Sequence, residues 1–381
     1  MAEFGPVTCA GCALLCDDVT LWSEDETAHL DPPCELGAEW FSARMFRPAD
    51  APAATIDGQP ADVDAALARV AELLRDARRP LLGSFDGATV EDARAALALA
   101  DHLGALVSTD RLDGPWPGAP AVALRGVSTA TLGEVRDRSR LIVCWREDPA
   151  RTHPRLLERL GLDGASERTL VVVDDADTDT AGSAEIRLRW PRERDLEALV
   201  TLHALERGLP APTDDLGGLY ERITAVPHVT FIYGPGLAAG AGGQRRALAL
   251  HELVRALSHH RHAVTFELPR APGTRSADDV LTWQSGYGRT VDFAAGHPEL
   301  ATATQPLEDV DATLLVEPGP AGGLVAGGGA EVWIRTAAAG VEASGTVHRL
   351  DGVPLTLQAP LENGAPTAAA LLTRLLGEVQ R

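Results

Sequence analysis

The sequence predicts an α/β protein with mainly parallel sheets, and two observations support this class. Short runs rich in Val, Leu and Ile alternate with longer amphipathic stretches through most of the 381-residue chain. Strands buried on both faces read as continuous apolar runs, whereas helices between them carry apolar residues at a spacing of three and four. This alternation is typical of parallel sheets covered by helices on both faces.

The expected helices show both the spacing and the end signals of amphipathic helices. Residues 61–79 place Val63, Leu67, Val70 and Leu74 on one face, with acidic residues early and arginines late. Residues 88–105 predict a helix that ends near Gly104, because glycine adopts the left-handed conformation of a C-cap without strain. Further helices are expected over 195–208 and 244–260. The apolar runs predict strands over 80–85, 105–110, 140–145, 169–175, 228–234, 262–268, 312–318 and 331–336.

Charge and composition exclude several classes of function. The chain has 55 acidic and 34 basic residues, a net charge of -21, which repels nucleic acid and anionic lipid. No apolar run reaches the roughly 18 residues that cross a bilayer, and the N-terminus lacks a basic region followed by an apolar one. We therefore expect a cytoplasmic protein. The basic residues are all arginine, which excludes a phosphate-binding Walker lysine and a lysine Schiff base.

The stretch "VTCAGCALLCDD" opens the most specific motif of the chain. Cys9, Cys12, Cys16 and Cys34 follow the spacing C-x2-C-x3-C-x17-C. Three thiolates from one tight loop and a fourth from a later loop favour a four-iron cluster, since thiolates are soft ligands for iron and zinc. Zinc and free thiols remain the alternatives, whereas a disulfide framework does not fit a reducing compartment. The isolated Cys144 lies in a predicted strand and is expected to be an inert core thiol.

For three other motifs we favour an ordinary structural role over ligand binding. The turn "GPG" at 234–236 follows a strand and could receive a phosphate, but it misses the dinucleotide fingerprint by one residue. The stretch "DDADTDT" at 174–180 lacks the glycine and the glutamate of a calcium loop. The run "SHHRH" at 258–262 suits a helix C-terminus. We find no "GxSxG" or "HExxH" motif, and we predict no catalytic residue of the chain's own.

Several blocks resemble the B subunit of formylmethanofuran dehydrogenase and the B subunit of the bacterial formyltransferase/hydrolase complex. They are "CAGCALLCDDVTL" at 9–21 and the segments 131–155, 281–298 and 342–357. The resemblance implies the fold of the tungsten- and molybdenum-pterin oxidoreductases, related to formate dehydrogenase and DMSO reductase, without the C-terminal barrel. It implies an iron–sulfur-type domain over 1–50, one α/β domain over 51–135 with 265–381, and a second, inserted domain over 136–264.

The same resemblance implies a subunit of an enzyme complex in one-carbon metabolism that has lost its own redox reaction. The archaeal enzyme binds its metal through a cysteine followed by histidine, in a loop where this sequence reads "STDRLDGPWPGAP" at 108–120. We therefore expect one 4Fe-4S cluster at Cys9, Cys12, Cys16 and Cys34, and no tungsten or molybdenum pterin. Expected partners are an amidohydrolase-type A subunit, a C subunit and a formyltransferase D subunit. The alternative is a redox-active, pterin-dependent subunit with a four-iron cluster.

Overall fold

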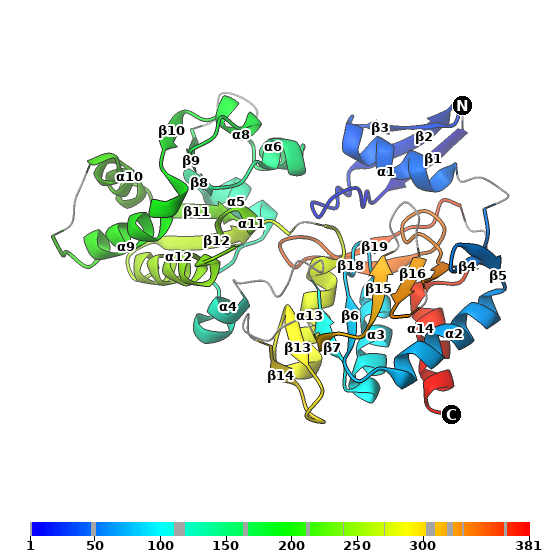
Figure 1. Ribbon diagram of the computed structural model, residues 1–381. Coiled ribbons are helices and arrows are strands. Elements are labelled where there is room, and N and C mark those ends of the chain that lie inside the picture. The colour runs from blue at the N-terminus through cyan, green and yellow to red at the C-terminus, as the bar shows by residue number, and fades with distance from the viewer. Residues whose placement is uncertain are drawn as a thin grey trace. The chain divides into compact units, whose positions relative to one another are not determined.

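The structure divides into two compact units. The computed structural model in Figure 1 describes residues 2–46, 51–109, 119–162, 167–210, 214–238, 240–269, 271–301, 309–317, 323–329, 331–361 and 364–381. Unit 1 comprises Met1–Pro115 and Ala271–Arg381, and unit 2 comprises Trp116–Arg270. In the described parts of the chain, no helix is long and apolar enough to cross a membrane.

Unit 1 is built on a nine-stranded mixed sheet in the order β14-β13-β7-β6-β15-β16-β17-β4-β5. Helices α2, α3, α13 and α14 pack with it, and α14 lies against both α2 and α3 (Figure 1). The strands are β4 (Ala54–Ile56), β5 (Gln59–Ala61), β6 (Pro80–Gly83), β7 (Leu106–Ser108), β13 (Thr290–Asp292), β14 (Glu299–Leu300), β15 (Ala312–Glu317), β16 (Gly323–Gly327) and β17 (Val332–Arg335). The helices are α2 (Val63–Asp76), α3 (Val90–Leu103), α13 (Thr274–Ser285) and α14 (Ala368–Val379).

The expectation of mainly parallel sheets is wrong for this sheet. Only β7, β6 and β15 pair in parallel, whereas β16, β17, β4, β5, β13 and β14 pair antiparallel with their neighbours. Parallel neighbours need a crossover of a dozen or more residues, but β15, β16 and β17 follow one another through short connections. The apolar run at 331–336 is therefore a hairpin strand, which composition alone does not distinguish from a parallel one.

A small antiparallel sheet at the N-terminus belongs to unit 1. It contains β1 (Ala2–Val7), β2 (Val19–Glu24) and β3 (Thr27–Asp31), followed by α1 (Glu35–Met45). The loop after β1 rests on the hairpin of β18 (Gly345–His348) and β19 (Pro354–Leu357), where Leu350 N donates to Ala13 O at 3.0 Å. Leu15 is completely buried in this contact with Val347 and Leu357, which fixes the loop on the rest of the unit.

Unit 2 carries a fully parallel five-stranded sheet in the order β10-β9-β8-β11-β12. Its strands are β8 (Leu141–Trp145), β9 (Thr169–Asp174), β10 (Ile186–Arg189), β11 (His228–Tyr233) and β12 (His262–Glu267). Its helices are α4 (Ala119–Arg125), α5 (Leu132–Arg138), α6 (Pro149–Thr152), α7 (Leu156–Arg159), α8 (Asp179–Gly182), α9 (Asp195–Glu206), α10 (Asp214–Thr224), α11 (Pro235–Ala238) and α12 (Gly243–Leu257), with a 3-10 turn at Arg192–Arg194.

The strand order of unit 2 creates a topological switch point. The chain moves outward from β8 through β9 to β10, and then returns to place β11 on the other side of β8. In doubly wound sheets of this kind, ligands bind beyond the carboxyl ends of the two strands at which the direction reverses. The residues that follow β8 and β11 therefore stand where a ligand site is expected in this fold.

Candidate functional site

The structure brings the four predicted cysteines together at one end of the small N-terminal sheet. Cys9 lies two residues after the end of β1, and the cysteine loop, residues 8–18, returns the chain to β2, which pairs with β1. The loop is closed by its own backbone, since Cys9 N donates to Cys16 O at 2.8 Å and Leu15 N donates to Cys12 O at 3.2 Å. Cys34 is the N-cap residue of α1.

Two glycines let α1 approach the cysteine loop. A Cβ atom on Gly37 would lie 3.0 Å from Cys9 Sγ and 3.7 Å from Cys34 Cβ. A Cβ atom on Gly11 would lie 3.0 Å from the Cα atom of Gly37. Side chains at these positions would push the helix away, so the glycines are what allow Cys34 to join the three cysteines of the loop.

The electrostatics of the cysteine loop suit a cationic group. Burial raises the pKa of Cys9 well above its usual range, a hydrogen bond from Gly11 N to its Sγ at 3.4 Å lowers it, and charge on the other three sulfurs raises it again. Burial and the charges of Cys16 and Cys34 raise the pKa of Cys12 to about 12, against a backbone hydrogen bond at Leu14. Buried thiols whose thiolate forms repel one another lose their protons readily only beside a metal, because the metal binds the deprotonated form.

The donor set therefore fits an iron–sulfur cluster in chemistry. All five cysteines are free thiols. Within the described ranges, no three His, Cys, Asp or Glu side chains lie close enough together to share a single metal ion. In a cubane cluster each cysteine binds a different iron atom, and N–H groups donate to the sulfurs, as Gly11 does here. Cys144 is completely buried in β8, where a core thiol is expected, and its pKa is raised by burial.

At the switch point of unit 2, a buried arginine follows β8. Arg146 is 3% exposed, and its Nε donates to both carboxylate oxygens of the fully buried Asp195, at 2.9 and 3.1 Å. Its Nη2 donates to Oδ1 of the same carboxylate at 2.9 Å. Its Nη1 donates to Asp174 and Asp175 at the end of β9, at 3.3 and 2.9 Å. Burial opposes the charge, but the hydrogen bonds and charge of Asp195 outweigh it and raise the pKa of Arg146. The guanidinium is thus fixed by three carboxylates and is not free for a ligand.

The next residue, Glu147, binds the turn that follows the other strand of the switch point. Glu147 Oε1 accepts the N–H of Gly236 at 2.5 Å, in the glycine turn, residues 234–236, that follows β11. A Cβ atom on Gly236 would lie 1.6 Å from the carbonyl oxygen of Arg146, so only glycine fits there. In nucleotide-binding sheets such an N–H donates to a phosphate. Here the protein's own carboxylate already holds the turn.

This arrangement was not predicted from the sequence. The glycine turn was identified, but Arg146, Glu147 and Asp195 were not. Polar residues directly after the strand 140–145 were the available signal, because the carboxyl ends of strands at a switch point form ligand sites. That sequence signal could not show that Arg146 binds Asp195, because the two residues are 49 positions apart and meet only in the folded protein.

The remaining sequence motifs have ordinary structural roles where they are described. Asp175 pairs with Arg146, and Asp177 pairs with Arg189, so this strand end neutralises arginines. The stretch 108–120, which the resemblance implies stands in place of a metal-binding cysteine and histidine, lies mostly at 110–118, outside the described residues. Just before residues 110–118, Thr109 donates to Asp278, which also pairs with Arg289 at 2.9 Å and so anchors the end of β7.

The fold and the cysteine loop together define a mixed α/β protein with a four-cysteine motif near its N-terminus. No family model matches the chain. One solved structure that is similar is a chain of the formyltransferase/hydrolase complex (FhcABCD) from Methylorubrum extorquens in complex with methylofuran, with a TM-score of 0.66 and 22% identity. The match covers 86% of this chain and 99% of that chain, and it establishes the fold.

Curated relatives identify the particular component that the chain resembles. The chain is 27% identical to the B subunit of tungsten-containing formylmethanofuran dehydrogenase 2 from Methanocaldococcus jannaschii, over 92% of each protein. It is 24% identical to the protein of the same name from Methanococcus maripaludis, over 100% of this chain and 99% of the relative. It is 26% identical to the B subunit of the formyltransferase/hydrolase complex Fhc from Methylorubrum extorquens, over 65% of this chain and 68% of the relative. The resemblance predicted from the sequence is confirmed.

Proposed function

We propose that this chain is the B subunit of a formyltransferase/hydrolase complex in one-carbon metabolism. In this role it supports formaldehyde oxidation to formate through tetrahydromethanopterin and a methanofuran-type carrier. The observation that carries the proposal is the match of the fold to 99% of a chain of the FhcABCD complex, together with full-length relatives that are B subunits. Its partners are the amidohydrolase-type A subunit, the C subunit and the formyltransferase D subunit.

The proposal further holds that this B subunit has no redox reaction of its own. On the resemblance to tungsten and molybdenum oxidoreductases, the two units would correspond to the pair of α/β domains that grip the pterin. The chain lacks any Cys-His pair to bind the metal. At the switch point of unit 2, the carboxylate of Glu147 holds the glycine turn, and Asp174, Asp175 and Asp195 surround Arg146. This acidic, internally bonded edge does not fit an anionic pterin dinucleotide.

A four-iron cluster is retained in the proposal, held by Cys9, Cys12, Cys16 and Cys34. A bound cluster exchanges single electrons, but without a pterin partner its role here is structural. It would neutralise the buried thiolates and tie α1 to the cysteine loop, so that the small sheet keeps its place on β18 and β19. The redox-active alternative is favoured by the tungsten-containing relatives, and metal content separates the two.

The test of the subunit role is co-purification from the native host under anaerobic conditions. A tagged chain should bring down an amidohydrolase and a formyltransferase in equal amounts, stable through gel filtration. If the chain instead purifies alone, or together with iron–sulfur electron-transfer subunits only, the assignment to a formyltransferase/hydrolase complex is incorrect.

A further inference from the structure

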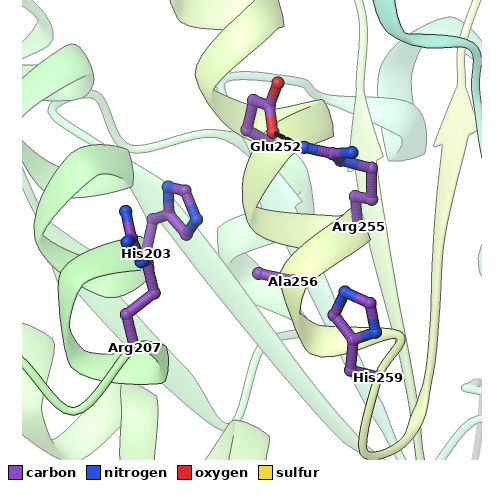
Figure 2. A pocket seen from close by; sticks show the side chains of 6 residues that line it. All are labelled: His203, Arg207, Glu252, Arg255, Ala256 and His259. Carbon is purple, nitrogen blue, oxygen red and sulfur yellow. Dashed lines mark hydrogen bonds and ion pairs between the residues drawn. The ribbon is translucent and has the colours of Figure 1, made fainter.

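A pocket in unit 2, remote from the switch-point residues in sequence, has no role in the proposed function. It has a volume of about 400 Å³ and is lined by His203, Arg207, Glu252, Arg255, Ala256 and His259. Figure 2 shows that the lining comes from two neighbouring helices, with His203 and Arg207 from the end of α9 and the other four residues from α12 and the turn after it.

The charge of this pocket is opposite to that of the protein. The chain has a net charge of -21, yet five of the six lining residues are basic or apolar. The one acidic residue, Glu252, is already shared by two arginines: Arg255 at 2.8 Å, drawn as a dashed line in Figure 2, and Arg125 of α4. Arg207 adds a further positive charge to the lining. The lining is therefore cationic, even with both histidines neutral.

Three of the lining side chains have unused hydrogen-bonding capacity. Within the described residues, the side chains of His203, Arg207 and His259 make no hydrogen bond or ion pair. A guanidinium offers five N–H donors in a plane, and an imidazole offers at least one. Because the donors come from both helices, a ligand with an acceptor at each end could bridge them.

We propose that this pocket binds a small dicarboxylate, with one carboxylate on Arg207 and the other on the α12 side at Arg255 and His259. One feature of the lining favours a dicarboxylate over phosphate. The Ala256 methyl group and the arginine stems offer apolar contact to a carbon chain that inorganic phosphate lacks.

Calorimetric titration of the full-length chain with glutarate tests the proposal, with inorganic phosphate and sodium chloride at matched ionic strength as comparison arms. Glutarate should bind saturably in the millimolar range, more tightly than phosphate. The variant Arg207→Gln should weaken glutarate binding about tenfold, because it removes a charge-assisted hydrogen bond.

The matched control is Arg222→Gln, an exposed arginine in the last turn of α10 that does not line the pocket. Its glutarate affinity should stay within twofold of the parent chain. Three results would each overturn the assignment: no saturable glutarate binding, equal weakening by both variants, or tighter binding of phosphate than of glutarate. None of them bears on the subunit role, which co-purification tests separately.

Discussion

The cysteine loop of unit 1 and the switch point of unit 2 treat their ligand-binding groups in opposite ways. The loop supplies three thiols and the start of α1 a fourth, and burial raises the pKa of Cys9 and Cys12 so that a metal is needed to offset their charge. The switch point instead satisfies its donors internally, with Gly236 N–H on Glu147 and Arg146 on Asp195. In the proposed function, the two cofactor sites that the resemblance implies have diverged independently, since the thiol donors are kept while the switch-point donors are bonded to the protein itself.

The largest expected effect is on the switch-point side. Gly236→Ala puts a Cβ atom 1.6 Å from the carbonyl oxygen of Arg146, so the backbone at residue 236 or at Arg146 must move. We expect unit 2 to lose more than about 4 kcal/mol of stability, measured by urea unfolding, or to fail to accumulate as folded protein. The control Gly218→Ala lies in α10 with open space around it, and should be neutral or slightly stabilising. Equal stability of the two variants would show that the turn is not packed as described.

The next prediction concerns the cysteine loop. Cys34→Ala removes one of four proposed ligands, so iron and acid-labile sulfide in anaerobically purified protein should fall from about four per chain to near zero. The buried Cys144→Ala should keep its iron, because that thiol lies in β8 of the other unit. Iron that survives in the Cys34 variant, or is absent from the parent protein as well, would contradict the proposed cluster.

A third prediction compares a buried ion pair with an exposed one in the same unit. Asp195→Asn leaves the buried Arg146 with two carboxylates at the end of β9 and should destabilise the fold by about 3 kcal/mol. Asp177→Asn breaks an exposed pair with Arg189 and should cost less than about 1 kcal/mol. Chemical unfolding at pH 7 measures both. A cost for Asp195→Asn no greater than that for Asp177→Asn would mean that the Arg146 network does not hold the switch point together.

The last predicted effect is a pH dependence, and only part of it develops between pH 7.5 and pH 5. Burial lowers the pKa of His153 from 6.5 to about 4, and its Nε2 has no hydrogen-bond partner among the described residues. The unfolded chain therefore binds this proton below about pH 6.5 and the folded protein only near pH 4. Above pH 6.5 the neutral, buried His153 does not reduce the free energy of unfolding. As the pH falls from 6.5 toward 4, that free energy declines by about 3 kcal/mol, because the unfolded chain takes up the proton first.

His153→Gln should flatten this acid-side loss, as seen in urea midpoints at pH 7.5 and pH 5. The exposed His297→Gln should keep the full slope of the parent protein. An unchanged slope in the His153 variant would mean that this imidazole is accessible to protons in the folded state.

The sequence alone predicts those elements whose structure a local residue pattern decides. The spacing of Val63, Leu67, Val70 and Leu74 predicted α2, and Gly104 caps α3 in the left-handed conformation, with φ of 62°. The cysteine spacing pointed to four residues that lie in the cysteine loop and at the start of α1, and their role as cluster ligands stays a prediction. Local patterns could not give the direction of β16 and β17, which depends on connection length.

Side-chain partners distant in sequence were equally beyond reach. Glu147 and Gly236 are 89 positions apart, and their hydrogen bond exists only because β11 returns beside β8. The positive φ of Arg146, 57°, is likewise imposed by its surroundings, since a non-glycine residue adopts this conformation only when packing and hydrogen bonds hold it there. Such features define the switch point, and the sequence shows only that polar residues follow the strand.

The central claim is that, as the proposed B subunit, this chain serves its complex without catalysing a redox reaction of its own. Metal analysis of the natively purified complex, combined with an assay of formate-linked dye reduction, tests it most directly. The account predicts about four irons for each copy of this chain, no stoichiometric tungsten or molybdenum, and no dye reduction. One tungsten or molybdenum per chain, with dye reduction to match, would contradict it.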